Sequence, residues 1–356
     1  MNAQTINPSE EQAHAFLRNV TFSGIRNPFL KTAQARGLEI LTDAPHSLSV
    51  RTMNGVVTVW NAAATGTVRI DIAASDRARL FIVKEGVLDQ LGRIVPYDAA
   101  QLRWSDSVDT IDRFPPNFQI ARIVRVVSLC DTFKRVRLAC GDLSAFDDRA
   151  IHLRFALPRA GIDEIIWPYV GNNGAAVWPK GDATLHRPVY TARSIDHLRN
   201  ELDIDVFLHD GGRITGWIEQ GLPDHTIGLT GPGGQGIPSC SNITMFGDET
   251  AFPAMARILE TLPANVQGTA TFCAHHATSL KYPVPDHASI EIIWHHVENG
   301  ASMADLASHA FQDGVDDRFV WFAGEKNDAA KIRTSFAEAR GEKKNSYIAG
   351  YWSADS

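Results

Sequence analysis

The sequence predicts a multidomain protein of mixed class, with a small α+β domain, an antiparallel β-barrel and a C-terminal α/β domain built on a parallel sheet. Its 356 residues suggest two or three domains, at roughly 100–200 residues each. Short β-branched runs follow one another over residues 118–235 with one brief helix candidate, which indicates a barrel. After residue 240, strand and helix patterns alternate, which indicates a parallel sheet.

The composition excludes several classes of protein. Hydrophobic residues make up 44% of the chain and charged residues 21%, as in globular domains. The net charge of −7 argues against a nucleic-acid partner or an anionic membrane. We find no apolar run of about 20 residues, and the polar N-terminus differs from a secretory signal. Four cysteines without C-x-x-C spacing predict reduced thiols in a cytoplasmic protein, without a metal site or a disulfide framework. We also expect a monomer without a membrane span.

The first 95 residues predict a small α+β domain. A polar helix pattern over residues 9–19 precedes β-branched runs that Asn-Gly and Thr-Gly separate, as in tight hairpins. A helix then begins after the capping pair Ser75-Asp76, with Leu80, Val83, Val87 and Leu91 on one face. No charged or nucleophilic cluster stands out, so the role of this domain stays unknown. Residues 96–116 contain three prolines and are interpreted as a linker.

The remaining chain predicts two further domains. Residues 117–236 make the barrel, and its insertion 161–188 is interpreted as a loop with two tryptophans. Residues 237–356 make the α/β domain. This is the domain order of flavin reductases, in which the barrel binds FAD and the α/β domain binds a nicotinamide cofactor.

The run R-P-V-Y-T-A-R at residues 187–193 is the first candidate site. A flavin needs an aromatic face against its ring, a small hydroxyl near its reactive nitrogen and cations for its pyrophosphate. Alternation along a strand places Tyr190 and Ala192 on one side and Thr191 and Arg193 on the other. The same strand can therefore supply both ring and polar contacts. Taken alone, the run also fits an ordinary barrel strand with exposed arginines.

This run resembles the R-x-Y-T-x-R flavin signature of the siderophore-interacting protein family. Members of this family are ferric-siderophore reductases of the ferredoxin-reductase superfamily. Tyr190, Thr191 and Arg193 match, whereas Arg187 stands three residues before the tyrosine instead of two. The resemblance implies that these residues orient FAD. Tyr190 and Thr191 become the candidate catalytic residues, with Thr191 nearest the reactive nitrogen.

Residues 209–217 resemble the family's histidine followed by Gly-Pro-Ala-Ser-x-Trp. His209, Gly212, Thr215 and Trp217 match, while Arg213 and Ile214 replace proline and alanine. In the family, a helix N-terminus here holds the FAD pyrophosphate on backbone N–H groups. The resemblance therefore assigns the matching residues to FAD, with a mainly structural role for the tryptophan.

Three later motifs resemble the family's nicotinamide half. The run G-D-E-T-A-F-P-A-M at residues 247–255, after a buried strand, resembles the family's G-D-E-T-A-L-P-A-I. The run V-W-F-A-G-E at residues 320–325 resembles V-W-x-A-G-E. The run G-Y-W at residues 350–352 resembles the family's terminal G-Y-W, which returns towards the flavin. Strands of a parallel sheet deliver such residues to its carboxyl edge, where nicotinamide ligands bind. The resemblance implies that cofactors contact Gly247, Asp248, Glu249, Thr250, Ala323, Gly324, Glu325 and Trp352. Glu325, the acid of the V-W-F-A-G-E motif, also suits the first turn of the next helix.

The resemblance implies a ferric-siderophore reductase that moves electrons from NADPH or NADH through FAD to siderophore-bound Fe(III), releasing Fe(II) for intracellular iron acquisition. Lys343 and Lys344 are candidate contacts for an anionic chelate, or simply a solvated basic turn. Two alternatives stay open: a flavin-dependent reductase of a ferredoxin-like partner, and a non-catalytic siderophore-binding protein. The pairs His275-His276 and His295-His296 are interpreted as hydrogen-bonded histidines, not metal ligands.

Overall fold

The computed structural model describes residues 10–62, 66–107, 111–159, 161–162, 164–209, 212–220, 226–297, 302–311, 318–340 and 345–354. The chain divides into two compact units. The first comprises residues 1–119, 156–187 and 228–231, and the second comprises residues 120–155, 188–227 and 232–356. None of the helices in the described part of the chain has the length and apolar character that crossing a bilayer requires.

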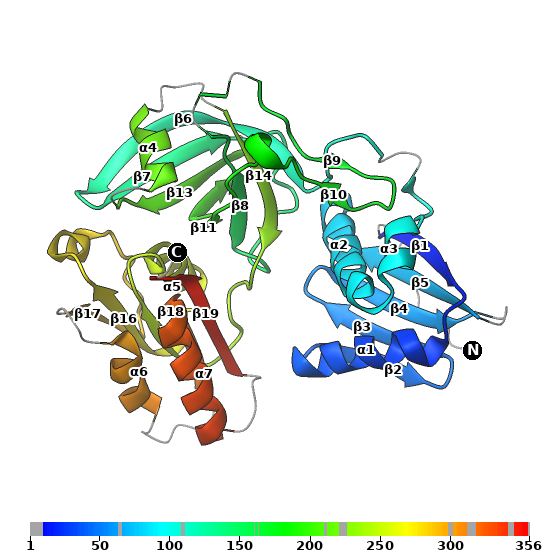
Figure 1. Cartoon of the computed structure of the whole chain (residues 1–356). Helices are drawn as coiled ribbons and strands as arrows, with labels where there is room; N and C mark the ends of the chain where they lie inside the picture. Colours follow the sequence, from blue (N-terminus) through cyan, green and yellow to red (C-terminus); the bar gives the residue numbers. More distant parts are fainter. Residues whose placement is uncertain are drawn as a thin grey trace. The chain divides into compact units, whose positions relative to one another are not determined.

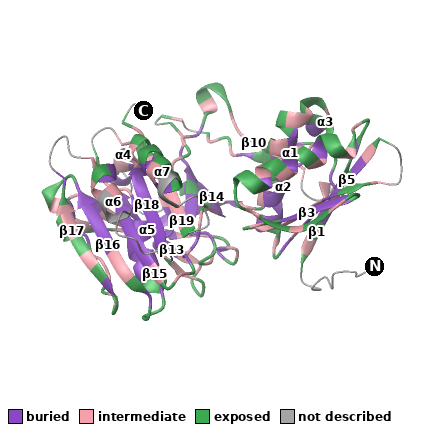
Figure 2. Ribbon diagram, turned by 90° about the horizontal axis from the view of Figure 1, so that it is seen from below, coloured by how far each residue is buried: buried purple, intermediate pink, exposed green. Residues whose placement is uncertain are grey.

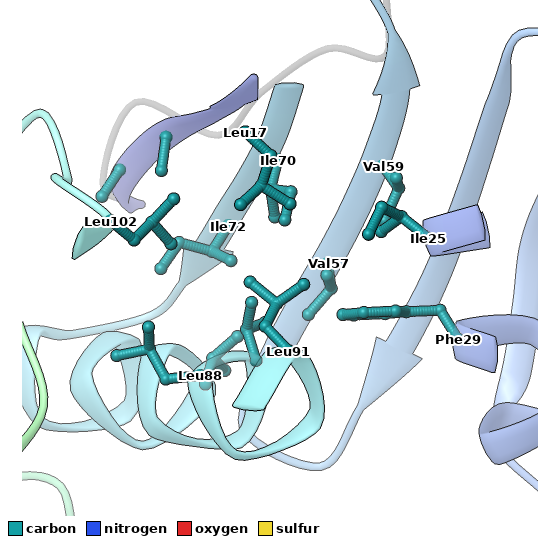
Figure 3. Packing of buried hydrophobic residues seen from close by; sticks show 14 of the residues in the cluster. Leu17, Ile25, Phe29, Val57, Val59, Ile70, Ile72, Leu88, Leu91 and Leu102 are labelled. Atoms are coloured by element: carbon teal, nitrogen blue, oxygen red, sulfur yellow. The ribbon is translucent and has the colours of Figure 1, made fainter. Parts of the chain in front are cut away.

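The first unit begins with an antiparallel sheet of five strands in the order β1-β5-β4-β3-β2 (Figure 1). Its strands are β1 (Glu11–Arg18), β2 (Glu39–Ala44), β3 (Ser47–Thr52), β4 (Gly55–Asn61) and β5 (Thr67–Ala74). Helices α1 (Phe22–Ala35) and α2 (Arg77–Ile94) pack on this sheet and close one apolar core (Figure 3). The expected α+β domain is therefore present.

Two elements of this domain, α2 and β1, can be compared directly with the helices that the sequence predicted. Asp76 caps α2 by accepting a hydrogen bond from the Arg79 N–H, as predicted. The helix expected over residues 9–19 is wrong, because this segment forms β1. Alternate residues of β1, not every third or fourth, point into the core, and they are small or apolar: Ala13, Ala15 and Leu17.

The stretch expected as a linker is structured at its start. Helix α3 (Pro96–Gln101) is followed by Leu102 and Trp104, which are buried in the core of the N-terminal sheet. Asp106 then accepts two hydrogen bonds from the Lys84 ammonium, at 2.7 and 2.8 Å. The packing of the N-terminal domain therefore extends at least to Asp106.

The predicted barrel strands form a sheet in the order β11-β8-β14-β6-β7-β13-β12. They are β6 (Phe118–Cys130), β7 (Phe133–Ala139), β8 (His152–Ala156), β11 (Val189–Thr191), β12 (Ser194–Asp196), β13 (Glu201–Phe207) and β14 (Thr226–Gly233). Helix α4 (Arg213–Gln220) is the one brief helix that the sequence suggested. The insertion carries the short hairpin β9 (Tyr169–Val170) and β10 (Ala176–Val177) and the 3-10 turn Gly181–Ala183.

The C-terminal domain is a parallel sheet in the order β17-β16-β15-β18-β19. Its strands are β15 (Asn242–Gly247), β16 (Gln267–Ala274), β17 (Ile290–His296), β18 (Phe319–Glu325) and β19 (Ser346–Trp352). Helix α5 (Phe252–Thr261) packs in one apolar cluster, and helices α6 (Met303–Phe311) and α7 (Lys326–Arg340) pack in another. Figure 2 colours the central strands of this sheet as buried. The doubly covered α/β fold is confirmed.

We expect Asp106→Ala to lower the free energy of unfolding by about 3 kcal/mol, because it leaves the Lys84 ammonium, 2% exposed, without its carboxylate. Chemical denaturation of the full chain measures this change. The double variant Lys84→Met with Asp106→Ala removes the buried charge and should recover most of the loss. An Asp106→Ala variant as stable as the wild type would contradict the packing of this segment.

Candidate functional site

The predicted flavin strand, β11 with the two residues after it, lies in the second unit and is buried at its C-terminal end. Thr191, Ala192 and Arg193 are each less than a tenth exposed, and Tyr190 is half-buried. The Tyr190 ring lies 5.2 Å from the ring of Phe155, which lies 6.4 Å from that of Trp217. Burial raises the pKa of the Tyr190 phenol. An aromatic cluster therefore joins two predicted FAD residues through Phe155, which the sequence did not single out.

A second residue outside the predicted set, His152, lies opposite Thr191 in the β8–β11 pairing. Its Nδ1 is 3.3 Å from the Thr191 hydroxyl, and its Nε2 is 3.1 Å from the Tyr351 hydroxyl. Burial and, to a smaller extent, the positive charge of Arg257 lower the pKa of His152 to about 4. The imidazole is therefore neutral at neutral pH and connects the flavin motif to the terminal strand.

Two arginines tie the flavin motif to helix α5. Arg257 donates to the Ala192 carbonyl at 2.5 Å and to the Asp148 carboxylate at 3.0 Å. Arg193 pairs with the Glu260 carboxylate at 2.5 Å, and its Nε lies 3.9 Å from an oxygen of Asp205 without a hydrogen bond. The charge expected to serve the FAD pyrophosphate is therefore paired within the protein.

Arg187, the shifted arginine of the motif, belongs to the first unit. Its guanidinium carbon lies 3.5 Å from the ring centre of Trp178, which is a close cation–π contact. Trp178 and Trp167 of the insertion also pack around the Phe118 ring. The structure therefore shows a packing partner for Arg187, and its assignment to FAD stays a prediction.

The second FAD motif is brought together at the start of α4. Gly212 donates a backbone hydrogen bond to the His209 carbonyl. A methyl group on Gly212 would approach the Thr215 hydroxyl to 2.8 Å and the His209 ring to 3.0 Å. These three residues therefore form one cradle, with Trp217 on the same helix. Only glycine fits at its centre without a shift of its neighbours.

The three nicotinamide motifs meet at the carboxyl edge of the parallel sheet. Gly247 of β15 is in register with Ala323 of β18, and Gly324 is in register with Gly350 of β19. The Asp248 carboxylate is buried beside this edge. It accepts hydrogen bonds from the Thr250 N–H and hydroxyl at 2.9 and 2.6 Å.

Trp352 completes this group from the terminal strand. Its indole N–H donates to Asp248 at 2.7 Å, although Trp352 is 41% exposed. Burial raises the pKa of Asp248, against the effect of these hydrogen bonds. The sequence-predicted residues Asp248, Thr250 and Trp352 are thus in direct contact.

Glu249 and Glu325 serve the protein itself. Glu249 accepts hydrogen bonds from the backbone N–H of His275 and of His276, at 2.7 and 2.9 Å, and contacts both imidazoles. Burial opposes ionisation, but the bonds from these histidines outweigh it and lower the pKa of Glu249 to about 2. Glu325 accepts from the N–H groups of Asn327 and Asp328 and so caps α7. Cofactor contacts of both acids stay predictions.

Two further expectations concern the substrate and metals. Lys343 and Lys344 lie outside the residues that the structure describes. Within the described ranges, no group of three or more His, Cys, Asp or Glu side chains could hold a metal ion.

The comparison with known families decides the relationship. Residues 122–236 match the siderophore-interacting FAD-binding domain, and residues 240–355 match the siderophore-interacting protein model. The chain belongs to the siderophore-interacting protein family. The two matches lie within the predicted barrel and α/β domains of this family member, and the N-terminal sheet lies outside both.

Relatives of this siderophore-interacting protein span most of its matched region. It is 29% identical over 253 residues to the NADPH-dependent ferric-chelate reductase of Escherichia coli (strain K12), which covers 67% of this chain and 93% of that protein. It is 29% identical over 172 residues to the ferric acinetobactin reductase of Acinetobacter baumannii, covering 46% of this chain and 59% of that protein. A siderophore utilization protein from T. fusca superposes with a TM-score of 0.59 at 26% identity, over 69% of this chain and 97% of that one.

The side chains around β11 of the siderophore-interacting protein fit FAD. Tyr190 offers an aromatic ring on one side of the strand, and Thr191 offers a hydroxyl on the other. At Gly212 the Thr215 hydroxyl and the His209 ring fill the place of a Cβ, so these three predicted FAD residues are packed together. The Arg193 guanidinium is buried with an unbonded Nε, a donor that an anion could use.

We expect a pH dependence of stability from His152. Its pKa falls from 6.5 when unfolded to about 4 when folded, so the unfolded chain binds the proton more readily. The contribution of the neutral imidazole is complete above pH 6.5 and is lost as the pH falls towards 4, by about 3 kcal/mol. Denaturation curves between pH 7 and pH 4.5 should show a smaller loss for His152→Asn than for the wild type. The exposed control His197→Asn should follow the wild type, and equal pH slopes for all three proteins would refute a buried neutral His152.

Proposed function

We propose that this protein is a cytoplasmic ferric-siderophore reductase that moves electrons from NADPH through FAD to siderophore-bound Fe(III), so that Fe(II) is released for the cell. The observation that carries the proposal is the hydrogen-bonded link from Thr191 through His152 to Tyr351. It joins the flavin motif of the barrel to the carboxyl edge of the parallel sheet within one compact unit. NADPH is preferred because the first relative described above is named NADPH-dependent.

When bound, FAD accepts two electrons together and can release them one at a time, which a ferric substrate requires. The protein's part is placement. The Tyr190 ring packs on Phe155, and this contact restricts its movement. Thr191 presents a hydroxyl held by His152. His209, Gly212 and Thr215 form the cradle for the remaining part of FAD.

The nicotinamide cofactor is assigned to the carboxyl edge of the parallel sheet. Gly247 and Gly324 leave this edge without side chains, and Asp248 fixes both Thr250 and Trp352. Gly324 must stay a glycine, because a methyl group there would lie 2.8 Å from the Asp248 carboxylate. The edge therefore combines closely packed glycines with fixed polar groups, as the glycine-rich turns of dinucleotide sites do.

Anaerobic absorbance spectroscopy tests this function. We expect the purified chain to carry flavin, to lose its flavin absorbance on addition of NADPH, and to regain it on addition of a ferric siderophore. Loss without recovery would exclude the ferric substrate, and a colourless protein that does not take up FAD would favour a siderophore carrier.

Reversal of charge at Lys343 and Lys344 should slow reoxidation by an anionic ferric chelate at least tenfold, and reoxidation by a neutral acceptor less than twofold. Equal effects on both acceptors would place these lysines outside the substrate site.

The pairing of Arg193 with Glu260 generates a second test. To serve the FAD pyrophosphate, the Arg193 guanidinium must leave this carboxylate, whose side chain is more than half exposed. Glu260→Gln should therefore tighten FAD binding about threefold, whereas Arg193→Met should weaken it about tenfold or more. Fluorescence titration of the apoprotein with FAD measures both. Unchanged FAD affinity in Arg193→Met would remove this arginine from the cofactor site.

The monomeric state and a ferredoxin as a second electron acceptor stay predictions. Light scattering of the purified chain tests the first. Competition between an oxidised ferredoxin-type protein and the ferric chelate in the same absorbance assay tests the second.

A further inference from the structure

Four polar side chains from three strands form a continuous line in the second unit, with His152 and Thr191 buried and the two tyrosines half-buried. Tyr347 and Tyr351 of β19 share a side-chain hydrogen bond. The Tyr351 hydroxyl lies 3.1 Å from His152 Nε2, and His152 Nδ1 lies 3.3 Å from the Thr191 hydroxyl. None of the motifs that led to the proposed function contains His152, so its role is open.

The surroundings of His152 determine which nitrogen carries its proton. The imidazole is 4% exposed, and Arg257 is the charged group that acts on it, which favours the neutral form. It also makes a hydrogen bond with the backbone of Tyr190, and this bond stabilises its proton. Because this bond stabilises the proton, its partner is the Tyr190 carbonyl, which can only accept. Tyr190 belongs to β11, the strand that Nδ1 faces. We therefore place the proton on Nδ1, which leaves Nε2 to accept from the Tyr351 hydroxyl.

This tautomer decides what the Thr191 hydroxyl can do. Because Nδ1 carries a proton, it cannot accept from the Thr191 hydroxyl; the Thr191 oxygen shares the Nδ1–H with the Tyr190 carbonyl, and its own proton is left for another acceptor. The reverse tautomer would draw that proton towards His152. The line of hydrogen bonds thus runs in one direction, from Tyr347 to Thr191.

We propose that His152 is a positioning residue of the flavin site, which holds Thr191 as a hydrogen-bond donor to the bound isoalloxazine and holds Tyr351 through its other nitrogen. The proposal rests on the proposed function, because it takes Thr191 to be the flavin contact. It goes further in giving the hydroxyl a direction and in naming the side chain that sets it.

The packing of the ring supports a fixed orientation. Gly234, at φ +70°, lies against the imidazole, and a side chain there would come within 3.1 Å of its Cγ. The β8–β11 register fixes His152 opposite Thr191. An imidazole held on one side by a glycine backbone and on the other by two hydroxyls has little freedom to flip.

Two substitutions separate the nitrogens of His152. The amide of His152→Asn reaches the position of Nδ1, and the amide of His152→Gln reaches that of Nε2. We expect His152→Gln to slow flavin reduction by NADPH about tenfold with the apparent affinity for NADPH unchanged, and His152→Asn to stay within about threefold of the wild type. Thr191→Val should add little to His152→Gln, because both remove the same donor. Equal loss in the two amide variants, or additive loss with Thr191→Val, would overturn the proposal.

A spectroscopic readout tests the tautomer without turnover. In the full chain with FAD, ¹⁵N shifts of labelled imidazoles should show a protonated Nδ1 and an unprotonated Nε2 at pH 7, for the signal that His152→Asn removes. A protonated Nε2 would overturn the proposal. Failure of the wild type to reduce any ferric chelate would instead refute the proposed function, and the tautomer would still be measured. FAD occupancy of each variant shows that it is folded.

Discussion

The candidate site depends on how the short segment 189–193 is held. Three polar contacts fix it: His152 to the Thr191 hydroxyl, Arg257 to the Ala192 carbonyl, and Arg193 to Glu260. Two of these partners come from α5, the helix that follows the G-D-E-T motif. A bond from a charged donor contributes about 1.5–3 kcal/mol, and loss of one partner strands a buried group. The flavin motif and the nicotinamide motif are therefore positioned by the same helix.

The carboxyl edge of the parallel sheet shows why its motifs are glycine-rich and acidic at once. The glycines admit neighbouring atoms closer than a methyl group would allow, as at Gly247 beside the Met255 sulfur and the Ala251 methyl. The acids face inward: Asp248 binds Trp352, and Glu249 binds the two histidines after β16. A motif that the family resemblance assigns to a cofactor therefore also supplies contacts that join the carboxyl ends of β15, β16 and β19.

Local pattern was sufficient where local structure decides the outcome. The alternation of strands and helices after residue 240, the Asp76 cap and the apolar face of α2 were all predictable, because periodicity and capping act over a few residues. β1 was mistaken for a helix, since Glu, Gln and Ala favour helices, while pairing with β5 selected a strand.

The candidate site was predictable only in part, for a related reason. Its motifs could be found by resemblance, but His152 and Arg257 could not. His152 meets Tyr351 across 199 positions and Arg257 meets Ala192 across 65, so no spacing in the sequence announces either contact. Phe155 could not be predicted as a site residue either, because nothing in the sequence indicates that its ring lies between those of Tyr190 and Trp217.

Burial has one consistent electrostatic effect on the polar groups around the flavin motif. It lowers the pKa of His152 and raises those of Tyr190 and Tyr351, so each of these groups is neutral at neutral pH. The Arg193 cation is balanced by Glu260, and Arg257 by Asp148. The flavin motif therefore acts on its surroundings mainly through oriented hydrogen bonds, not through net charge. In such a site the direction of each hydroxyl matters more than its presence, since a dipole reversed in place stabilises the opposite charge.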